Sequence, residues 1–154
     1  MVGNRRRGDN GKRVIVVRVA VVFFGGNDRD RFAEIARGVA AGIGKAGHHV
    51  DVIDGHTAGT TKLTGYEYIA LGAPGVSFFG GKIPPQVREF LSQAGIVGGK
   101  KCFAFTSHRL FGAGKVLKTL MGVMEHEGMF IRYSEILRSR SEAELVGTRL
   151  KLDH

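Results

Sequence analysis

Apolar and polar positions follow two different periods along this chain, and the two periods alternate from about residue 14 onward. The stretch VIVVRVAVVFF, residues 14–24, is almost continuously β-branched and aromatic, which is typical of a strand buried on both faces of a parallel sheet. Arg18 interrupts this stretch, so we expect its regular buried part after that residue. The following residues 32–43 carry an apolar side chain every three or four positions, the spacing of a helix that packs one face on a sheet. Gly47 is the expected end of this helix.

The same succession of strand and helix continues to the end of the chain. Strands are predicted at residues 49–54, 66–73, 100–107 and 129–137, and further helices at residues 84–95, 114–128 and 141–151. Ser141, with Glu144 three residues later, predicts a capping box at the start of the last helix. Five strands that alternate with helices predict a three-layer α/β fold with a five-stranded parallel sheet, formed by one domain over residues 14–154.

The composition is that of an ordinary globular domain, with 43% hydrophobic and 24% charged residues. No apolar run approaches the ~20 residues of a membrane-spanning helix, and no signal-peptide pattern follows the basic N-terminus. A single cysteine, Cys102, excludes an internal disulfide framework. We therefore expect a cytoplasmic location.

The net charge of +9 is concentrated near the N-terminus. Residues 1–13 carry five basic side chains and one aspartate, so this tail holds +4 of the charge and leaves a mildly basic domain. We interpret the tail as a disordered, solvated leader. The alternative is a patch for nucleic acid or an anionic membrane, although the tail has no aromatic residue on which a base can stack.

The candidate site lies in three loops, because ligands of open parallel sheets bind beyond the carboxyl ends of the strands. These loops follow the first, third and fourth predicted strands: GGNDRDR (25–31), APGVSFFGGKIPP (73–85) and TSHRLFGAGK (106–115). Their glycines permit close approach of the backbone to a ligand. Phe78, Phe79 and Phe111 are suited to stack on a planar ring. The alternative for Phe78 and Phe79 is that they pack their loop onto the domain.

The order and contents of these segments resemble the flavodoxin family over about residues 14–150. ALGAPGVSFFGGKIPPQVREFL is similar to that family's middle segment, KKCFAFTSHRLFGAGKVLKTLMGVMEHEGM to the next segment, and IARGVAAGI to its first helix. The resemblance implies a flavodoxin-like fold that binds FMN, with the phosphate in the first loop and the flavin ring flanked by the other two. It also implies that a peptide at Gly75 or Gly80 turns to hydrogen-bond the flavin when the flavin gains an electron.

The implied FMN-binding residues come from all three loops. They are Gly25, Gly26, Asn27, Arg29 and Arg31 in the first, Pro74, Gly75, Val76, Ser77, Phe78, Phe79 and Gly80 in the second, and Thr106, Ser107, His108, Phe111 and Gly112 in the third. No catalytic or metal-ligating set is predicted. Strand alternation places only His49 and Asp51 of the nearby polar residues on one face, which are too few ligands for a metal.

The first loop departs from the family pattern. Flavodoxins use a run of Ser and Thr hydroxyls with a glycine there, whereas this chain has no Ser or Thr in its first 56 residues. A phosphate would have to rest on backbone amides, the Asn27 side chain, and the guanidinium groups of Arg29 and Arg31. Asp28 and Asp30 oppose an anion and are suited to cap the helix instead. A phosphate loop and an aspartate-capped helix start both stay open.

These observations lead us to expect a small FMN-dependent electron carrier rather than an enzyme that converts a substrate. Because the domain is basic, we expect its redox partner protein to be acidic. Two alternatives stay open: a flavin-free flavodoxin-like interaction module, and an FMN-dependent quinone or disulfide reductase. The fold permits the reductase, but fold alone does not give function and no residue of this chain indicates it.

Overall fold

The structure is a computed structural model that describes residues 5–7 and 13–152; residues 1–4, 8–12 and 153–154 lie outside the described part. Its centre is a five-stranded sheet whose neighbouring strands all pair in parallel. The strands of this sheet are β3 (Arg18–Phe23), β4 (His49–Asp54), β5 (Tyr68–Gly72), β6 (Lys101–Ser107) and β7 (Phe130–Leu137). The strand order in space is β4-β3-β5-β6-β7, which places β4 and β7 at the two edges.

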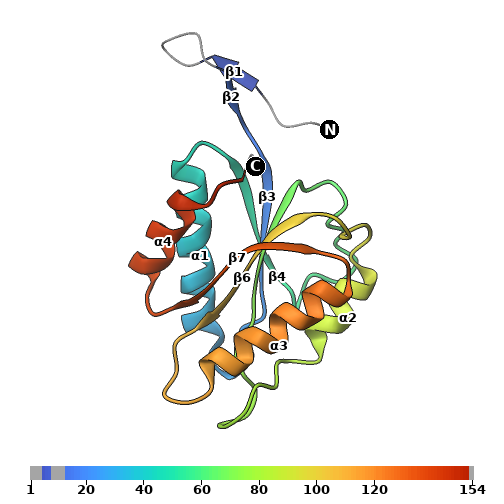
Figure 1. Ribbon diagram of the computed structural model, residues 1–154, viewed down its shortest axis with the longest axis vertical. Helices are drawn as coiled ribbons and strands as arrows, with labels where there is room; N and C mark the ends of the chain where they lie inside the picture. Colours follow the sequence, from blue (N-terminus) through green and yellow to red (C-terminus); the bar gives the residue numbers. More distant parts are fainter. Residues whose placement is uncertain (1–4, 8–12, 153–154) are drawn as a thin grey trace.

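Helices cover both faces of the sheet (Figure 1). They are a short 3-10 helix η1 (Gly26–Asp28), followed by α1 (Arg29–Lys45), α2 (Gln86–Gln93), α3 (Ala113–His126) and α4 (Arg140–Arg149). Helices α1 and α4 lie on one face, and α2 and α3 lie on the other. The predicted three-layer α/β fold with a five-stranded parallel sheet is therefore confirmed. None of the described helices has the length and apolar character needed to cross a bilayer.

The first predicted strand, residues 14–24, is shorter than its apolar run, and its regular buried part follows Arg18 as expected. Arg13–Ile15 forms strand β2, which pairs antiparallel with β1 (Arg5–Arg7) in a hairpin that projects away from the domain (Figure 1). The sheet strand begins only at Arg18, whose guanidinium donates to the carbonyl oxygen of Gly65 at 3.1 Å. Apart from the backbone of this hairpin, the tail of residues 1–13 lies outside the described part, and its disorder stays a prediction.

Strand β3 is buried on both faces, as its continuous apolar sequence predicts. Val19 and Val21 belong to the core under α1 and α4, whereas Ala20 and Val22 belong to the core under α2 and α3. The apolar positions of α1 from Phe32 to Ile43 are buried in the first of these two cores. Gly47 follows the helix with a left-handed φ of 96°, so the predicted helix end is also confirmed.

The start of α4 differs from the prediction. Ser139 is the N-cap, and its hydroxyl oxygen accepts a hydrogen bond from the backbone amide of Glu142 at 3.2 Å. The predicted capping box at Ser141 and Glu144 is wrong. The sequence contains two overlapping Ser-x-x-Glu patterns that are locally equivalent, and the carboxylate of Glu144 is instead paired with the ammonium group of Lys45 on α1. The helix therefore starts at the Ser139 pattern, and the glutamate of the other pattern makes a contact with α1.

Helices α1 and α4 approach each other at glycines. A Cβ atom placed on Gly42 of α1 would lie 2.1 Å from the carbonyl oxygen of Glu144, and one on Gly147 of α4 would lie 2.4 Å from the carbonyl oxygen of Val39. Two ion pairs border this contact, Lys45 with Glu144 and Arg140 with Glu34. The glycines therefore fix α4 against α1 at a distance that no larger residue permits.

The reactivity of Cys102 provides a test of how well the interior of the sheet is shielded from solvent. The side chain lies buried on β6, and burial raises the pKa of its thiol to about 12. At pH 8 roughly one thiol in 10⁴ is then ionised, and the thiolate is the reactive form. We expect the native protein to resist dithionitrobenzoate, while the same protein in guanidinium chloride releases one equivalent of the coloured thiolate. Prompt reaction of the native protein would mean that β6 opens readily.

Candidate functional site

The loops after β3, β5 and β6 meet at the carboxyl end of the sheet. They line a small cavity of about 110 Å³, which is the space of a few water molecules or one phosphate group. The lining residues are Gly25, Asn27, Asp28, Arg31 and Phe32 from the first loop and the start of α1, Pro74 and Gly75 from the second, and Ser107 at the end of β6. The three loops that the sequence singled out thus line one cavity.

Two glycines allow the first loop to lie close to its neighbours. Gly26 has a φ of 61°, and a Cβ atom there would lie 2.9 Å from Cγ of Pro74 in the second loop. A Cβ atom on Gly25 would lie 2.6 Å from the Cα atom of Arg29. A larger residue at either position would push the first loop away from the second loop or from the helix start.

The start of α1 is not capped by an aspartate. Asp28 occupies the N-cap position, but its side chain makes no capping hydrogen bond, and the Asp30 side chain in the first turn is fully exposed. The alternative of an aspartate-capped helix start is therefore not supported. Backbone amides at a helix start that lack a capping side chain are suited to bind an anion, and the carboxylate of Asp28, which also lines the cavity, opposes one.

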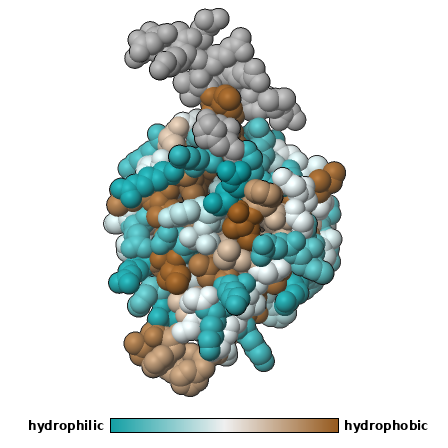
Figure 2. Space-filling model, viewed as in Figure 1, coloured by the Kyte–Doolittle hydropathy of each residue, from teal (hydrophilic) through white to brown (hydrophobic). Residues whose placement is uncertain are grey.

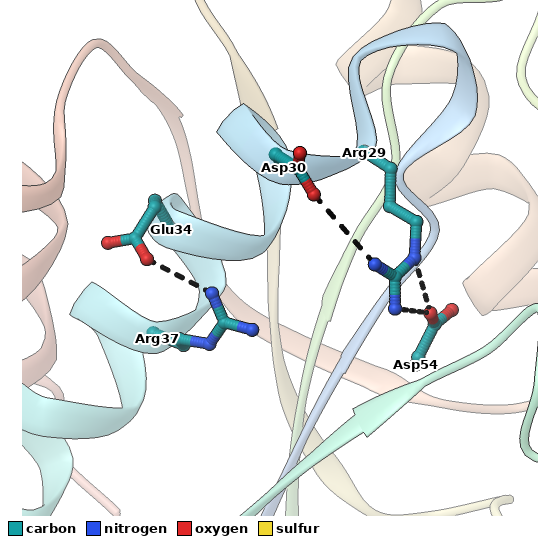
Figure 3. Close-up of polar contacts among 5 residues, drawn as sticks. All are labelled: Arg29, Asp30, Glu34, Arg37 and Asp54. Atoms are coloured by element: carbon teal, nitrogen blue, oxygen red, sulfur yellow. Dashed lines mark hydrogen bonds and ion pairs between the residues drawn. The ribbon is translucent and has the colours of Figure 1, made fainter.

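The two arginines of the first loop have different surroundings. Figure 3 shows Arg29 reaching from the start of α1 to Asp54 at the end of β4; its Nε and Nη2 atoms donate to Asp54 Oδ2 at 2.9 and 2.7 Å. Arg29 does not line the cavity, whereas Arg31 does. A long contact of 3.5 Å joins Arg31 Nη2 to the carbonyl oxygen of His108 in the third loop. Of the two predicted phosphate ligands, the structure brings only Arg31 to the cavity.

Arg109 joins the second and third loops and was not predicted from the sequence. Its Nη1 atom donates to the carbonyl oxygen of Ser77, and its Nη2 atom donates to that of Gly80 at 2.7 Å. A Cβ atom on Gly75 would lie 2.5 Å from Arg109 Nη1, so this glycine makes room for the guanidinium. An arginine in an exposed loop carries no sequence signal for such a contact, because its carbonyl partners are 32 and 29 residues away.

Other predicted site residues hold the loops in place. Thr106 is buried, and its hydroxyl donates to the carbonyl oxygen of Ala73 at 2.7 Å, which ties together the ends of β5 and β6. Gly112 is the N-cap of α3 with a φ of 76°, and a Cβ atom there would lie 2.8 Å from the carbonyl oxygen of Gly80. The Thr106 hydroxyl therefore already has an acceptor within the protein.

Phe78, Phe79 and Phe111 form an exposed aromatic cluster. Their ring centroids are 4.8 Å apart for Phe78 and Phe79, 5.9 Å for Phe78 and Phe111, and 5.5 Å for Phe79 and Phe111. The three residues are 70%, 66% and 47% exposed, so Phe78 and Phe79 are not buried against the body of the domain and contact only Phe111 among the aromatic rings outside their own loop. Figure 2 shows apolar residues gathered at the lower end of the molecule, where Figure 1 places the loops after β5 and β6. Val76 and Leu110 extend this exposed apolar surface.

Solved structures that match this architecture include several flavodoxins. An archaeal flavodoxin matches 85% of this chain and 94% of its own chain with a TM-score of 0.68 and 20% identity. The two-electron reduced flavodoxin of Megasphaera elsdenii matches 84% of this chain and 96% of its own, with a TM-score of 0.69 and 20% identity. Oxidised flavodoxin 1 of Bacillus cereus matches 87% and 99%, with a TM-score of 0.66 and 18% identity.

The chain therefore has a flavodoxin-like fold, as the resemblance in its sequence implied. No protein-family model matches the sequence, and no curated protein matches it either. At identities of 20% or less, the structural matches establish the arrangement of strands and helices and leave the chemistry of the site to its own residues.

Proposed function

We propose that this protein binds FMN at the junction of its three loops and carries electrons between redox partners. The observation that carries the proposal is the convergence of the loops after β3, β5 and β6 on one small cavity beside an exposed aromatic cluster. A phosphate and a planar ring are the two ends of such a cofactor. When bound, FMN would supply the redox chemistry, and the protein would supply position, hydrogen bonds and exclusion of water.

The residues around the cavity suit a phosphate without the usual hydroxyl run. Arg31 would offer a charge-assisted hydrogen bond, and Asn27 and Ser107 have side chains that can donate. The uncapped amides at the start of α1 add partial positive charge. Asp28 weakens the site, so we expect a lower affinity for the phosphate than a loop with hydroxyls alone would give.

The aromatic cluster suits the ring end of the cofactor. The three rings now contact one another, so a flavin ring would lie against them or separate Phe111 from the other two. Gly80 has a φ of 83°, and no atom lies within 4 Å of the point that a Cβ atom would occupy, but its carbonyl oxygen accepts a hydrogen bond from Arg109 Nη2 at 2.7 Å. Gly75 also lies against the Arg109 guanidinium. A turn of the peptide at either predicted position would therefore have to break or rearrange a contact with Arg109.

We further propose that the partner protein is acidic. Lys82 in the second loop and Lys115 in the first turn of α3 are exposed near the aromatic cluster, and the chain carries a net charge of +9. An acidic partner would be steered toward this end of the molecule by charge and would contact its exposed apolar side chains.

The proposal is tested by adding the purified full-length protein to FMN and following flavin fluorescence. Saturable quenching is expected, and its absence would reject FMN binding. For the phosphate, we expect Arg31→Ala to weaken FMN about tenfold and to leave riboflavin nearly unchanged, because a charge-assisted hydrogen bond to the phosphate is lost. Arg29→Ala is the matched control, since Arg29 is paired with Asp54; it should affect FMN and riboflavin equally.

A flavin-free interaction module is the second candidate function. The feature that favours it is the aromatic cluster, whose three rings already contact one another at the surface, beside a first loop without hydroxyls. In that case the protein would be colourless, would not quench FMN, and would lose partner binding when Phe78 and Phe79 are replaced by serine.

A further inference from the structure

A second and larger cavity lies at the opposite end of the sheet. Its volume is about 350 Å³, within the range of small-molecule sites. Its apolar floor is formed by Tyr68, Tyr133, Val146 and Leu150, and its basic rim by Arg132, Arg149 and Lys151. Tyr68 is the first residue of β5, whereas the candidate flavin site lies beyond the last residue of that strand. At about 3.3 Å per residue the two sites are separated by roughly 15 Å or more.

The cavity exists because of how α4 packs. The glycine contact holds α4 against α1, and α4 makes far less contact with the edge strand β7. Tyr133 of β7 therefore keeps an exposed side, although its ring is stacked on Phe103 at 5.6 Å. The gap between the C-terminal end of α4 and the start of β7 is lined by side chains of both elements.

A β-bulge brings two consecutive residues to this cavity. Cys102 of β6 is paired with Ile131 and Phe103 with Tyr133, so Arg132 is the extra residue of β7. In a regular strand, neighbouring side chains point to opposite faces, and Arg132 and Tyr133 would not line one cavity. A bulge re-aims a side chain, and this one adds an arginine to a tyrosine on the same cavity wall.

Tyr68 offers a hydrogen-bond donor inside the cavity. The residue is 1% exposed, and among the described residues its hydroxyl has no hydrogen-bond partner. Tyr68 lines the cavity, and its hydroxyl is not fully enclosed by protein, so the hydroxyl is open to the cavity. Burial raises the pKa of Tyr68 and the Cys102 thiol raises it further, while the charge of Arg132 acts against both. The hydroxyl is therefore protonated and can donate.

The basic rim carries three positive charges that no carboxylate of the described residues pairs with. Within residues 5–7 and 13–152, none of these three side chains forms an ion pair. The Arg132 guanidinium lies over the Phe130 ring, with its Cζ atom 5.7 Å from the ring centroid. Lys45 and Arg140, on the neighbouring helices, are both paired with glutamates. One floor residue does bind a carboxylate, since the Tyr133 hydroxyl donates a hydrogen bond to Glu135 at 2.7 Å.

We infer that this cavity is a binding site for a small aromatic carboxylate, with the ring on the apolar floor and the carboxylate toward the basic rim and the Tyr68 hydroxyl. An aromatic ring suits a floor of two tyrosines and two aliphatic side chains. A carboxylate suits arginines that lack an acidic partner, because it forms charge-assisted hydrogen bonds with them. This inference does not rest on flavin binding.

The test uses 2-naphthoate and its neutral analogue 2-naphthalenemethanol as probes of the full-length protein, with amide NMR shifts as the readout. We expect naphthoate to shift amides of residues 130–133 and 146–151 saturably at millimolar concentration or below. The alcohol should bind about tenfold more weakly, because it lacks the charge. Shifts confined to residues 76–79 and 110–111, equal binding of both probes, or no saturable binding would each overturn the inference.

Variants then identify the groups that bind the probe. Arg149→Gln should weaken naphthoate about tenfold, and Tyr68→Phe severalfold, since each removes a donor to the carboxylate. Arg88→Gln is the matched control, because Arg88 is an exposed arginine of α2 on the other face of the sheet. It removes the same charge and should leave the affinity unchanged. An equal loss in Arg149→Gln and Arg88→Gln would mean that only net charge attracts the probe, and would overturn the site.

Discussion

Replacing Gly42 by alanine should lower the free energy of unfolding by at least ~2 kcal/mol, which is a large part of the stability of a small domain. A Cβ atom at this position would lie 2.1 Å from the carbonyl oxygen of Glu144, so α4 would have to move away from α1. The clash is with backbone, which cannot rotate away as a flexible side chain does. Guanidinium denaturation followed by circular dichroism measures the change.

Gly44→Ala provides the matched control, two residues further along the same helix. The nearest atom to a Cβ there is Val50 Cγ1 at 3.8 Å, which is an ordinary contact. Alanine loses less backbone entropy on folding than glycine does, so this variant should gain about 0.5 kcal/mol. Two glycine-to-alanine changes in one helix are therefore expected to have opposite signs. Destabilisation of the same size in both variants would contradict the glycine contact between α1 and α4.

Replacing Arg109 by alanine should have the second large effect, both on stability and on flavin binding. The change leaves the carbonyl oxygens of Ser77 and Gly80 without their donor and removes the guanidinium under Gly75. The loss of two charge-assisted hydrogen bonds should cost ~2 kcal/mol of unfolding free energy. Because the second loop would then lose its attachment to the third, FMN and riboflavin should both bind about tenfold more weakly.

The equal loss for both ligands separates Arg109 from Arg31. In the proposed FMN site, Arg109 would hold the loops that flank the ring, whereas Arg31 would contact the phosphate directly. Arg109→Lys should recover little of the loss, since an ammonium group does not have the planar fork that reaches two carbonyl oxygens. Arg88→Ala, at an exposed arginine outside the loops, should change neither stability nor binding. Normal flavin affinity in Arg109→Ala would show that the loops do not need this attachment.

The sequence predicted the elements well because their patterns are local. The β-branched run around Val21 indicated a strand buried on both faces, and the spacing from Phe32 to Ile43 indicated the buried face of α1. Prediction failed where two local choices were equivalent. Nothing local separates the Ser139 cap from one at Ser141, and nothing local shows that β2 leaves the sheet to pair with β1.

Only part of the candidate flavin site could be predicted from the sequence. The rule that ligands bind at the carboxyl ends of parallel strands selected three loops, and these do line one cavity. The sequence treated Arg29 and Arg31 alike, because they are two residues apart in the same basic and acidic run. Their surroundings differ because Asp54, which binds Arg29, comes from the neighbouring strand β4.

The sequence by itself determined the class of fold, the order of its strands and helices, and the position of the loops, because periodicity and turn residues act over short distances. Only the tertiary structure decided which side chains meet. It placed Arg109 between two loops, left the start of α1 uncapped, set α4 against α1 through Gly42, and opened the cavity beside Tyr68 and Arg132. Each of these depends on backbone atoms or charges that are distant in the chain. The chemistry proposed for both ends of the sheet therefore rests on contacts that no local pattern encodes.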